Sequence, residues 1–112
     1  MKLFRLYLGS QHPHGTFTQD ELKDAIKSTL LQHFQSITLM PGEGWFRGEY
    51  EPGITVLVAT ENIALLLQCT EALRSRLRQN GIGVEFASRY HRVTEGRDLA
   101  ALAWEILDPS TP

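Results

Sequence analysis

The segment that most constrains the fold is a Gly- and Pro-rich excursion between two β-type runs. It extends from Ile37 to Thr60 and reads ITLMPGEGWFRGEYEPGITVLVAT. Turn-forming Gly and Pro residues punctuate its middle, whereas Ile54 to Ala59 is apolar on both faces apart from Thr55. The pattern predicts a short strand over Ser36 to Met40, then an exposed loop, then a central strand with both faces covered.

The first helix has the clearest start signal in the chain. Thr18-Gln19-Asp20-Glu21 reads as a capping box, in which the Thr18 hydroxyl accepts from the Glu21 amide and the Glu21 carboxylate accepts from the Thr18 amide. Phe17 before the cap and Leu22 in the first turn form a hydrophobic staple. Apolar residues then recur at helical spacing, which predicts an amphipathic helix that starts at Thr18.

Periodicity predicts the remaining elements. Alternating apolar residues indicate strands over Lys2 to Gly9 and, as one continuous run, Val84 to Val93. A second helix is expected between a Thr60 cap and a left-handed stop at Asn80-Gly81, and a short third helix over Asp98 to Leu107. The order is β-α-β-β-α-β plus a C-terminal helix, so we expect one α/β (α+β) domain over residues 1–112 with a ferredoxin-like sandwich.

Composition excludes several classes of protein and site. The net charge is −2, from 11 basic and 13 acidic residues, so no overall field would gather nucleic acid. Cys69 is the single cysteine, which excludes an intramolecular disulfide and a multi-cysteine metal site. Arg5 interrupts the apolar N-terminus, and no later run reaches the roughly 18 apolar residues of a membrane span. We therefore expect a cytoplasmic protein with no nucleic-acid or membrane partner, no metal and no cofactor.

Several short motifs resemble the PII and CutA superfamily of small trimeric proteins. They are Pro41-Gly42, Trp45-Phe46-Arg47-Gly48, Glu51 ahead of a strand, Val93-Thr94-Glu95-Gly96 and Leu102-Ala103-Trp104. The N-terminal half also resembles a bacterial family of unknown function with the same layout. The resemblance covers about the whole chain and implies a ferredoxin-like fold, a homotrimer and clefts between subunits.

Two groups of side chains are candidates for binding. Trp45, Arg47, Glu49 and Tyr50 lie in the excursion, and Arg89, His91 and Arg92 lie near the end of the last predicted strand. The excursion offers flat aromatic area and a bidentate donor for carboxylate or phosphate. These side chains suit ligand binding and contact with a neighbouring subunit equally. For the second group, salt bridges to nearby acidic residues are the favoured alternative to an anion site.

These observations indicate a non-enzymatic ligand-binding or regulatory module that acts as an oligomer, with a trimer favoured. Its ligand would be a small anion, or a partner protein, held in clefts between subunits where the two groups meet. A small enzyme on the dimeric α+β barrel plan, with His91 or Glu49 transferring a proton, is the alternative, and a structural assembly protein is another. The sequence assigns no catalytic residue.

Overall fold

The computed structural model describes residues 1–108, which form three helices and nine strands. In chain order the elements are β1 (Lys2–Gly9), β2 (Gln11–His12), β3 (Gly15–Thr16), α1 (Gln19–Leu30), β4 (Ser36–Gly42), β5 (Trp45–Phe46), β6 (Glu49–Tyr50), β7 (Gly53–Thr60), α2 (Ile63–Arg76), β8 (Gly81–Phe86), β9 (Arg89–Thr94) and α3 (Leu99–Leu107).

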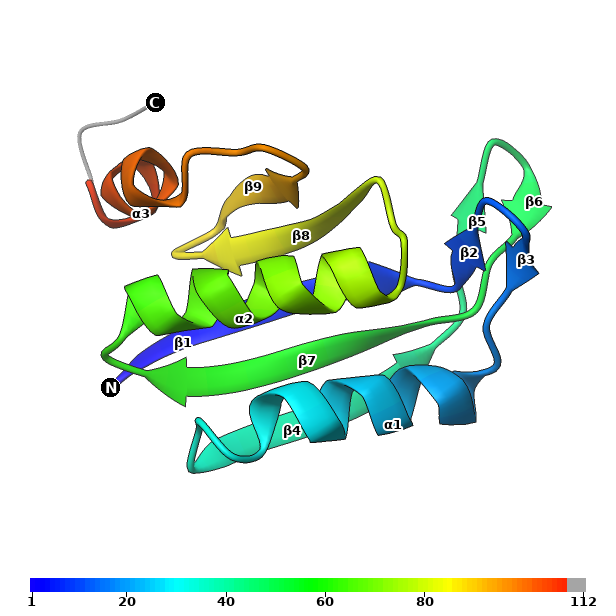
Figure 1. Ribbon diagram of the computed structural model, residues 1–112, viewed down its shortest axis with the longest axis horizontal. Helices are drawn as coiled ribbons and strands as arrows, with labels where there is room; N and C mark the ends of the chain where they lie inside the picture. Colours follow the sequence, from blue (N-terminus) through cyan, green and yellow to red (C-terminus); the bar gives the residue numbers. More distant parts are fainter. Residues whose placement is uncertain (109–112) are drawn as a thin grey trace.

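The main sheet has five strands in the order β4-β7-β1-β8-β9, and every neighbouring pair is antiparallel. The first four strands with α1 and α2 make the ferredoxin-like α+β arrangement, and β9 adds a fifth strand at one edge. The two small hairpins, β2–β3 and β5–β6, extend from the same end of the sheet (Figure 1).

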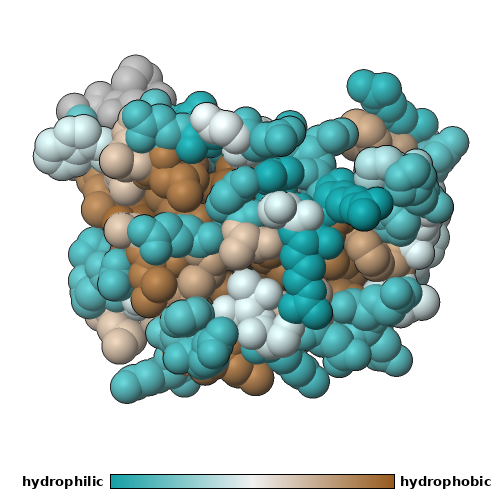
Figure 2. All heavy atoms as spheres, viewed as in Figure 1, coloured by the Kyte–Doolittle hydropathy of each residue, from teal (hydrophilic) through white to brown (hydrophobic). Residues whose placement is uncertain are grey.

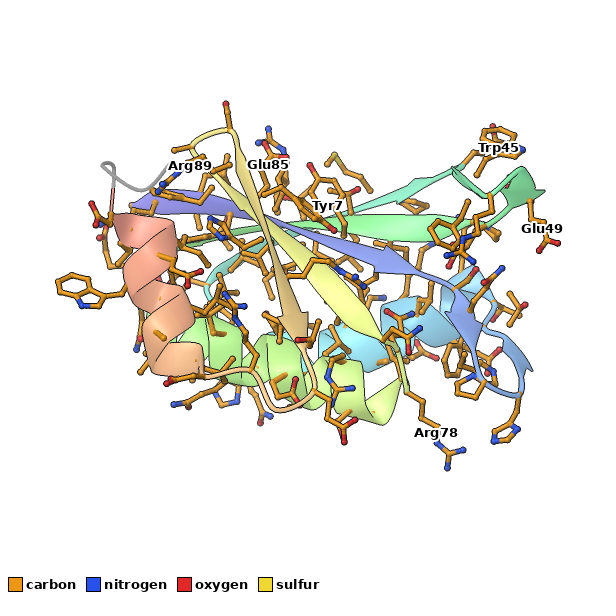
Figure 3. The ribbon with its side chains drawn as sticks, turned by 90° about the horizontal axis from the view of Figure 1, so that it is seen from above. Tyr7, Trp45, Glu49, Arg78, Glu85 and Arg89 are labelled. Carbon is orange, nitrogen blue, oxygen red and sulfur yellow. The ribbon has the colours of Figure 1, made fainter. Side chains whose placement is uncertain are left out.

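The helices cover one face of the sheet and create the core (Figure 3). Alternate residues of each strand point under them, and many of these side chains are fully buried, including Phe4, Leu6, Val56, Val58 and Val84. Helix α3 packs beside α2 and against β9, burying Leu102 and Ile106. Burial of these apolar side chains therefore holds the three helices on this face of the sheet.

The opposite side of the sheet carries no helix, and we call it the open face. It consists of Leu3, Arg5, Tyr7, Thr38, Met40, Thr55, Leu57, Gly83, Glu85, Tyr90 and Arg92, which share a side by strand register. Strand β7 is central, as predicted. However, only its helix-facing residues are buried, and the open-face residues Thr55 and Leu57 are half-buried in the described chain.

The predicted capping box is present. The Thr18 Oγ1 atom accepts from the Glu21 amide at 3.1 Å, and Glu21 Oε1 accepts from the Thr18 amide at 3.0 Å. Acidic Asp20 and Glu21 also lie in the first turn, where the helix dipole favours negative charge.

The predicted continuous strand over Val84 to Val93 is wrong. The chain reverses at Ala87 and Ser88, whose φ angles are 52° and 65°, and makes a two-residue hairpin loop between β8 and β9. Such loops usually carry Asn or Gly at the left-handed positions, so the sequence lacks the usual signal. The reversal creates the fifth strand.

Three further boundaries differ from the sequence-based expectation. The Asn62 side chain caps α2 by accepting a hydrogen bond from the Leu65 amide. The Thr60 hydroxyl, which was expected to cap the helix, accepts instead from the Asn62 amide in the preceding turn. Arg78, with φ of 52°, supplies the left-handed residue after α2, where Asn80-Gly81 was expected to do so. The excursions after β1 and β4, expected as loops, each contain a short hairpin.

Candidate functional site

A pocket of about 310 Å³ lies where the open face of the sheet meets the β5–β6 hairpin. It is lined by Tyr7, Leu8, Gly9, Gly42, Glu43, Gly44, Trp45, Phe46, Glu51, Gly53, Ile54 and Thr55. These residues come from the ends of β1, β4 and β7 and from the start of the hairpin. The volume is at the lower end of the range of small-molecule sites.

Glu51 fixes the wall of this pocket. Its Oε1 atom accepts from the backbone amides of Ser10 at 3.1 Å and Gln11 at 3.3 Å, and its own amide donates to the Gly44 carbonyl oxygen at 2.7 Å. The carboxylate passes so close over Gly9 that a Cβ atom there would overlap it. Glu51 therefore joins the base of the hairpin to the turn after β1.

The charge of the pocket has one sign. Its ionisable lining residues are Glu43, Glu51 and Tyr7, and no Lys, Arg or His is among the lining residues of the described chain. Trp45 and Phe46 add aromatic surface and remain 66% and 56% exposed. Aromatic faces with carboxylates nearby are complementary to a positively charged or hydrogen-bond-donating group.

The hairpin itself is a compact aromatic arm. The ring centroids of Trp45 and Tyr50 are 5.4 Å apart in an edge-on arrangement, and the Arg47 guanidinium lies 5.1 Å from the Phe46 ring centroid. Arg47 and Gly48 form its two-residue loop, with φ angles of 53° and 81°. The side chains expected to form a binding arm thus lie together, although only Trp45 among the four predicted residues lines the pocket.

A polar network on the open face adjoins the pocket through Tyr7. The Tyr7 hydroxyl donates to Glu85 Oε1, and Arg5 Nη1 lies 3.7 Å from Glu85 Oε2. The hydrogen bond to the Glu85 carboxylate, followed by burial, raises the pKa of Tyr7. Tyr90 covers Gly83, so its ring lies 6.2 Å from that of Tyr7. Sequence reasoning missed Tyr7 and Glu85, because only the strand pairing brings them together.

The second predicted group, Arg89, His91 and Arg92, is divided between the two faces of β9. Arg89 and His91 share the helix-covered side, as alternation predicted. Arg92 lies on the open face, where its guanidinium group covers Gly81. Arg89 donates to the backbone carbonyl oxygens of Glu105 at 3.3 Å and Ile106 at 2.7 Å, at the C-terminal end of α3. Through these two hydrogen bonds Arg89 joins β9 to the end of α3.

Arg89 of the second predicted group does not meet the hairpin within one subunit. Figure 3 shows Trp45 and Glu49 at one end of the sheet and Arg89 at the other. An anion held by Arg47 together with Arg89 would therefore require a second subunit. Arg92 lies opposite Gly83, which is in turn opposite the pocket residue Tyr7.

The described residues contain neither a metal-ligand cluster nor a membrane-spanning helix. Among residues 1–108, no three His, Cys, Asp or Glu side chains are grouped as metal ligands would be. Cys69 is buried, and burial raises the pKa of its thiol, which opposes thiolate reactivity. None of the helices described for this chain has the length and apolar character needed to cross a membrane.

Comparison with known proteins identifies a similar fold. No protein-family model and no curated protein sequence matches the chain. A solved structure titled as a phage SAM lyase in the apo state superimposes with a TM-score of 0.62 at 13% sequence identity. The superposition covers 85% of this chain and 90% of the lyase chain. At this identity the likeness establishes that the two chains share a fold.

Proposed function

We propose that the protein is a non-enzymatic module that binds a small molecule in the pocket beside the β5–β6 hairpin and acts as a homo-oligomer in the cytoplasm. The observation that carries the proposal is the composition of the pocket. Trp45 and Phe46 line it together with Glu43 and Glu51, and none of the described residues that line it is basic. Such a pocket favours a ligand that presents a cationic or donor-rich group.

Exposed apolar side chains support the oligomer. Trp45, Phe46 and Tyr50 on the hairpin and Leu3 and Met40 on the open face are between 41% and 66% exposed. Grouped apolar residues of this size are commonly buried between subunits. The resemblance to PII and CutA proteins favours a trimer, with a mass of about 38 kDa from chains of 12.7 kDa. Light scattering at micromolar concentration tests this, and a strictly monomeric mass would exclude the assembly.

Thermal shift against pairs of similar ligands that differ in charge tests the binding proposal. S-adenosylmethionine and S-adenosylhomocysteine are one such pair, because the first carries a sulfonium charge and one additional methyl group. A ligand present at 100 times its Kd stabilises the folded state by about 2.7 kcal/mol, so the melting temperature should rise by about 10 °C for the charged member alone.

Variants locate the site. Glu43→Gln and Trp45→Ala change lining residues and should reduce the shift, whereas Glu49→Gln, on the same hairpin but outside the lining, should leave it intact. A shift that survives both lining substitutions would place the ligand elsewhere.

In a second form of this proposal, the ligand is an anion that Arg47 binds in a cleft between subunits. Charge reversal at Arg47 should then abolish a shift produced by nucleotides or carboxylates while the melting temperature of the free protein stays nearly constant, since Arg47 is an exposed loop residue. Equal shifts for Arg47→Glu and wild type would eliminate this version. Retention of a protein from cell extract by wild type, and its loss in Arg47→Glu, would identify a partner protein as the ligand.

A second candidate function is an enzyme that acts on S-adenosylmethionine. The specific observation in its favour is that a pocket suited to a cation occurs on a fold shared with a phage SAM lyase. Incubating the protein with S-adenosylmethionine and following its loss by chromatography separates the two proposals. Consumption that Glu43→Gln abolishes would establish the enzyme and overturn the non-enzymatic module, whereas binding without consumption supports the module.

A further inference from the structure

Polar side chains hold α3 onto the edge strand β9. Arg89 donates to the carbonyl oxygens of Glu105 and Ile106, and Arg97 Nη2 lies 2.7 Å from Glu105 Oε2. These contacts fix the C-terminal half of the helix, whose Leu102 and Ile106 are fully buried. Figure 2 shows hydrophobic residues reaching the surface on the side of the molecule where α3 and the start of α2 lie.

His91 lies among these contacts without a partner for its Nε2 atom. It is on the helix-covered side of β9, two residues after Arg89, and its Nε2 atom is buried with no hydrogen bond within the described chain. A neutral imidazole is tolerated there. An imidazolium would place an additional unpaired charge in a poorly solvated position, which is costly.

The charged groups around His91 come from each neighbouring segment. Arg89 on β9 and Arg97 after β9 oppose its protonation, and Glu105 on α3 favours it. On α2, which also packs against β9, Glu71 and Arg74 are paired with each other at 2.7 Å. Burial is the largest influence, and together with the two guanidinium groups it holds the pKa of His91 below its usual value.

We propose that His91 is a proton-operated latch: its protonation releases α3 from β9 and α2 and uncovers the apolar surface that the helix covers. The released state leaves His91 in water, where its ordinary pKa of about 6.5 applies. Below that pH the released state binds one more proton than the docked state, so docking weakens as the pH falls. The inference is independent of the ligand pocket, which lies at the opposite end of the sheet.

Residue-resolved hydrogen exchange at pH 7.5 and between pH 6.5 and 5 tests the latch. After correction for intrinsic exchange rates, the α3 amides should lose about tenfold protection for each pH unit below 6.5, until the pKa of docked His91 is passed. Amides of β1 and β7 should keep their protection over the same range.

Two variants separate His91 from other titrating groups. His91→Gln cannot acquire charge, so its α3 protection should not depend on pH in this range. His33→Gln, a matched change at an exposed histidine, should behave as wild type. The same loss of α3 protection in His91→Gln, or simultaneous loss in α3, β1 and β7, would overturn the proposal.

A direct titration keeps the test decisive if His91→Gln does not fold. The imidazole ring protons of wild-type His91 report its pKa by NMR, and the latch requires a value below the ordinary value of about 6.5 for a solvated imidazole. A pKa of His91 at or above that ordinary value would refute it.

Discussion

A pair of glycines that face each other across β4 and β7 allows a sharp test of the sheet geometry. Gly53 begins β7 and pairs with Gly42 on one side and Gly9 on the other. A Cβ atom added to Gly53 would come closer than 3.0 Å to the Leu8 carbonyl oxygen and lie 3.5 Å from the Leu8 carbonyl carbon. At Gly42 an added Cβ atom would meet nothing within 4 Å.

The consequence differs because the obstacle at Gly53 is backbone. The Leu8 oxygen cannot move without displacing β1 from β7, so Gly53→Ala should destabilise the protein by about 1–3 kcal/mol, the usual cost of overpacking. At this chain length about 4 °C corresponds to 1 kcal/mol, which predicts a melting temperature lower by about 4–12 °C. Gly42→Ala should be neutral or stabilising by about 0.4–1 kcal/mol, because alanine reduces the entropy of the unfolded chain.

Urea denaturation of both variants beside wild type measures these free energies of unfolding, provided that the m-value stays constant. Free energies of unfolding for Gly53→Ala and Gly42→Ala that agree within about 0.5 kcal/mol would refute the reasoning. They would mean that the Leu8 carbonyl does not lie above Gly53 as described.

Three further predictions concern local stability. Thr18→Ala should cost about 1 kcal/mol by removing the α1 cap, with Thr18→Ser retaining it, and an unchanged denaturation midpoint would contradict the cap. Replacing Ala87-Ser88 by Asn-Gly should stabilise the β8–β9 hairpin by about 1–2 kcal/mol, because both positions have positive φ; a lower urea midpoint would argue against that turn. Glu71→Ala should cost about 1–3 kcal/mol, since it removes the carboxylate that Arg74 Nε and Nη2 both contact at 2.7 Å. The hydrogen bonds from Arg74 lower the pKa of Glu71, so this contribution is present above the ordinary carboxyl pKa and is lost as the pH falls through the lowered value. If the free energy of unfolding falls equally with decreasing pH in Glu71→Ala and in wild type, Glu71 does not make this contribution.

Local chemistry made several elements predictable. The α1 cap depends on two side chains three residues apart, and the buried face of β1 depends on Phe4, Leu6 and Leu8 at alternate positions. Both signals act over a single turn or strand, so no distant residue is needed to produce them. The order of the elements then predicted the ferredoxin-like arrangement, which the sheet order confirms.

The two failures have different causes. The reversal at Ala87-Ser88 has no Asn or Gly, and it is imposed by the pairing of β8 with β9, which is a tertiary contact. The left-handed Arg78 precedes the Asn80-Gly81 pair that local rules favour, and the Gln79 amide donates to the Arg74 carbonyl oxygen across the end of α2, as in a helix C-cap. In both places hydrogen bonds hold a non-glycine residue at positive φ against its local preference.

By itself, the sequence determined the core-facing stripe of each helix, the central position of Ile54 to Ala59 and the aromatic character of the hairpin. Only the tertiary structure decided which side chains meet. It joined Tyr7 to Glu85 across 78 positions, brought Glu51 to the amide of Ser10, and separated Arg47 from Arg89. The physical reason is that strand periodicity specifies a face, whereas strand order and register specify the neighbour on that face.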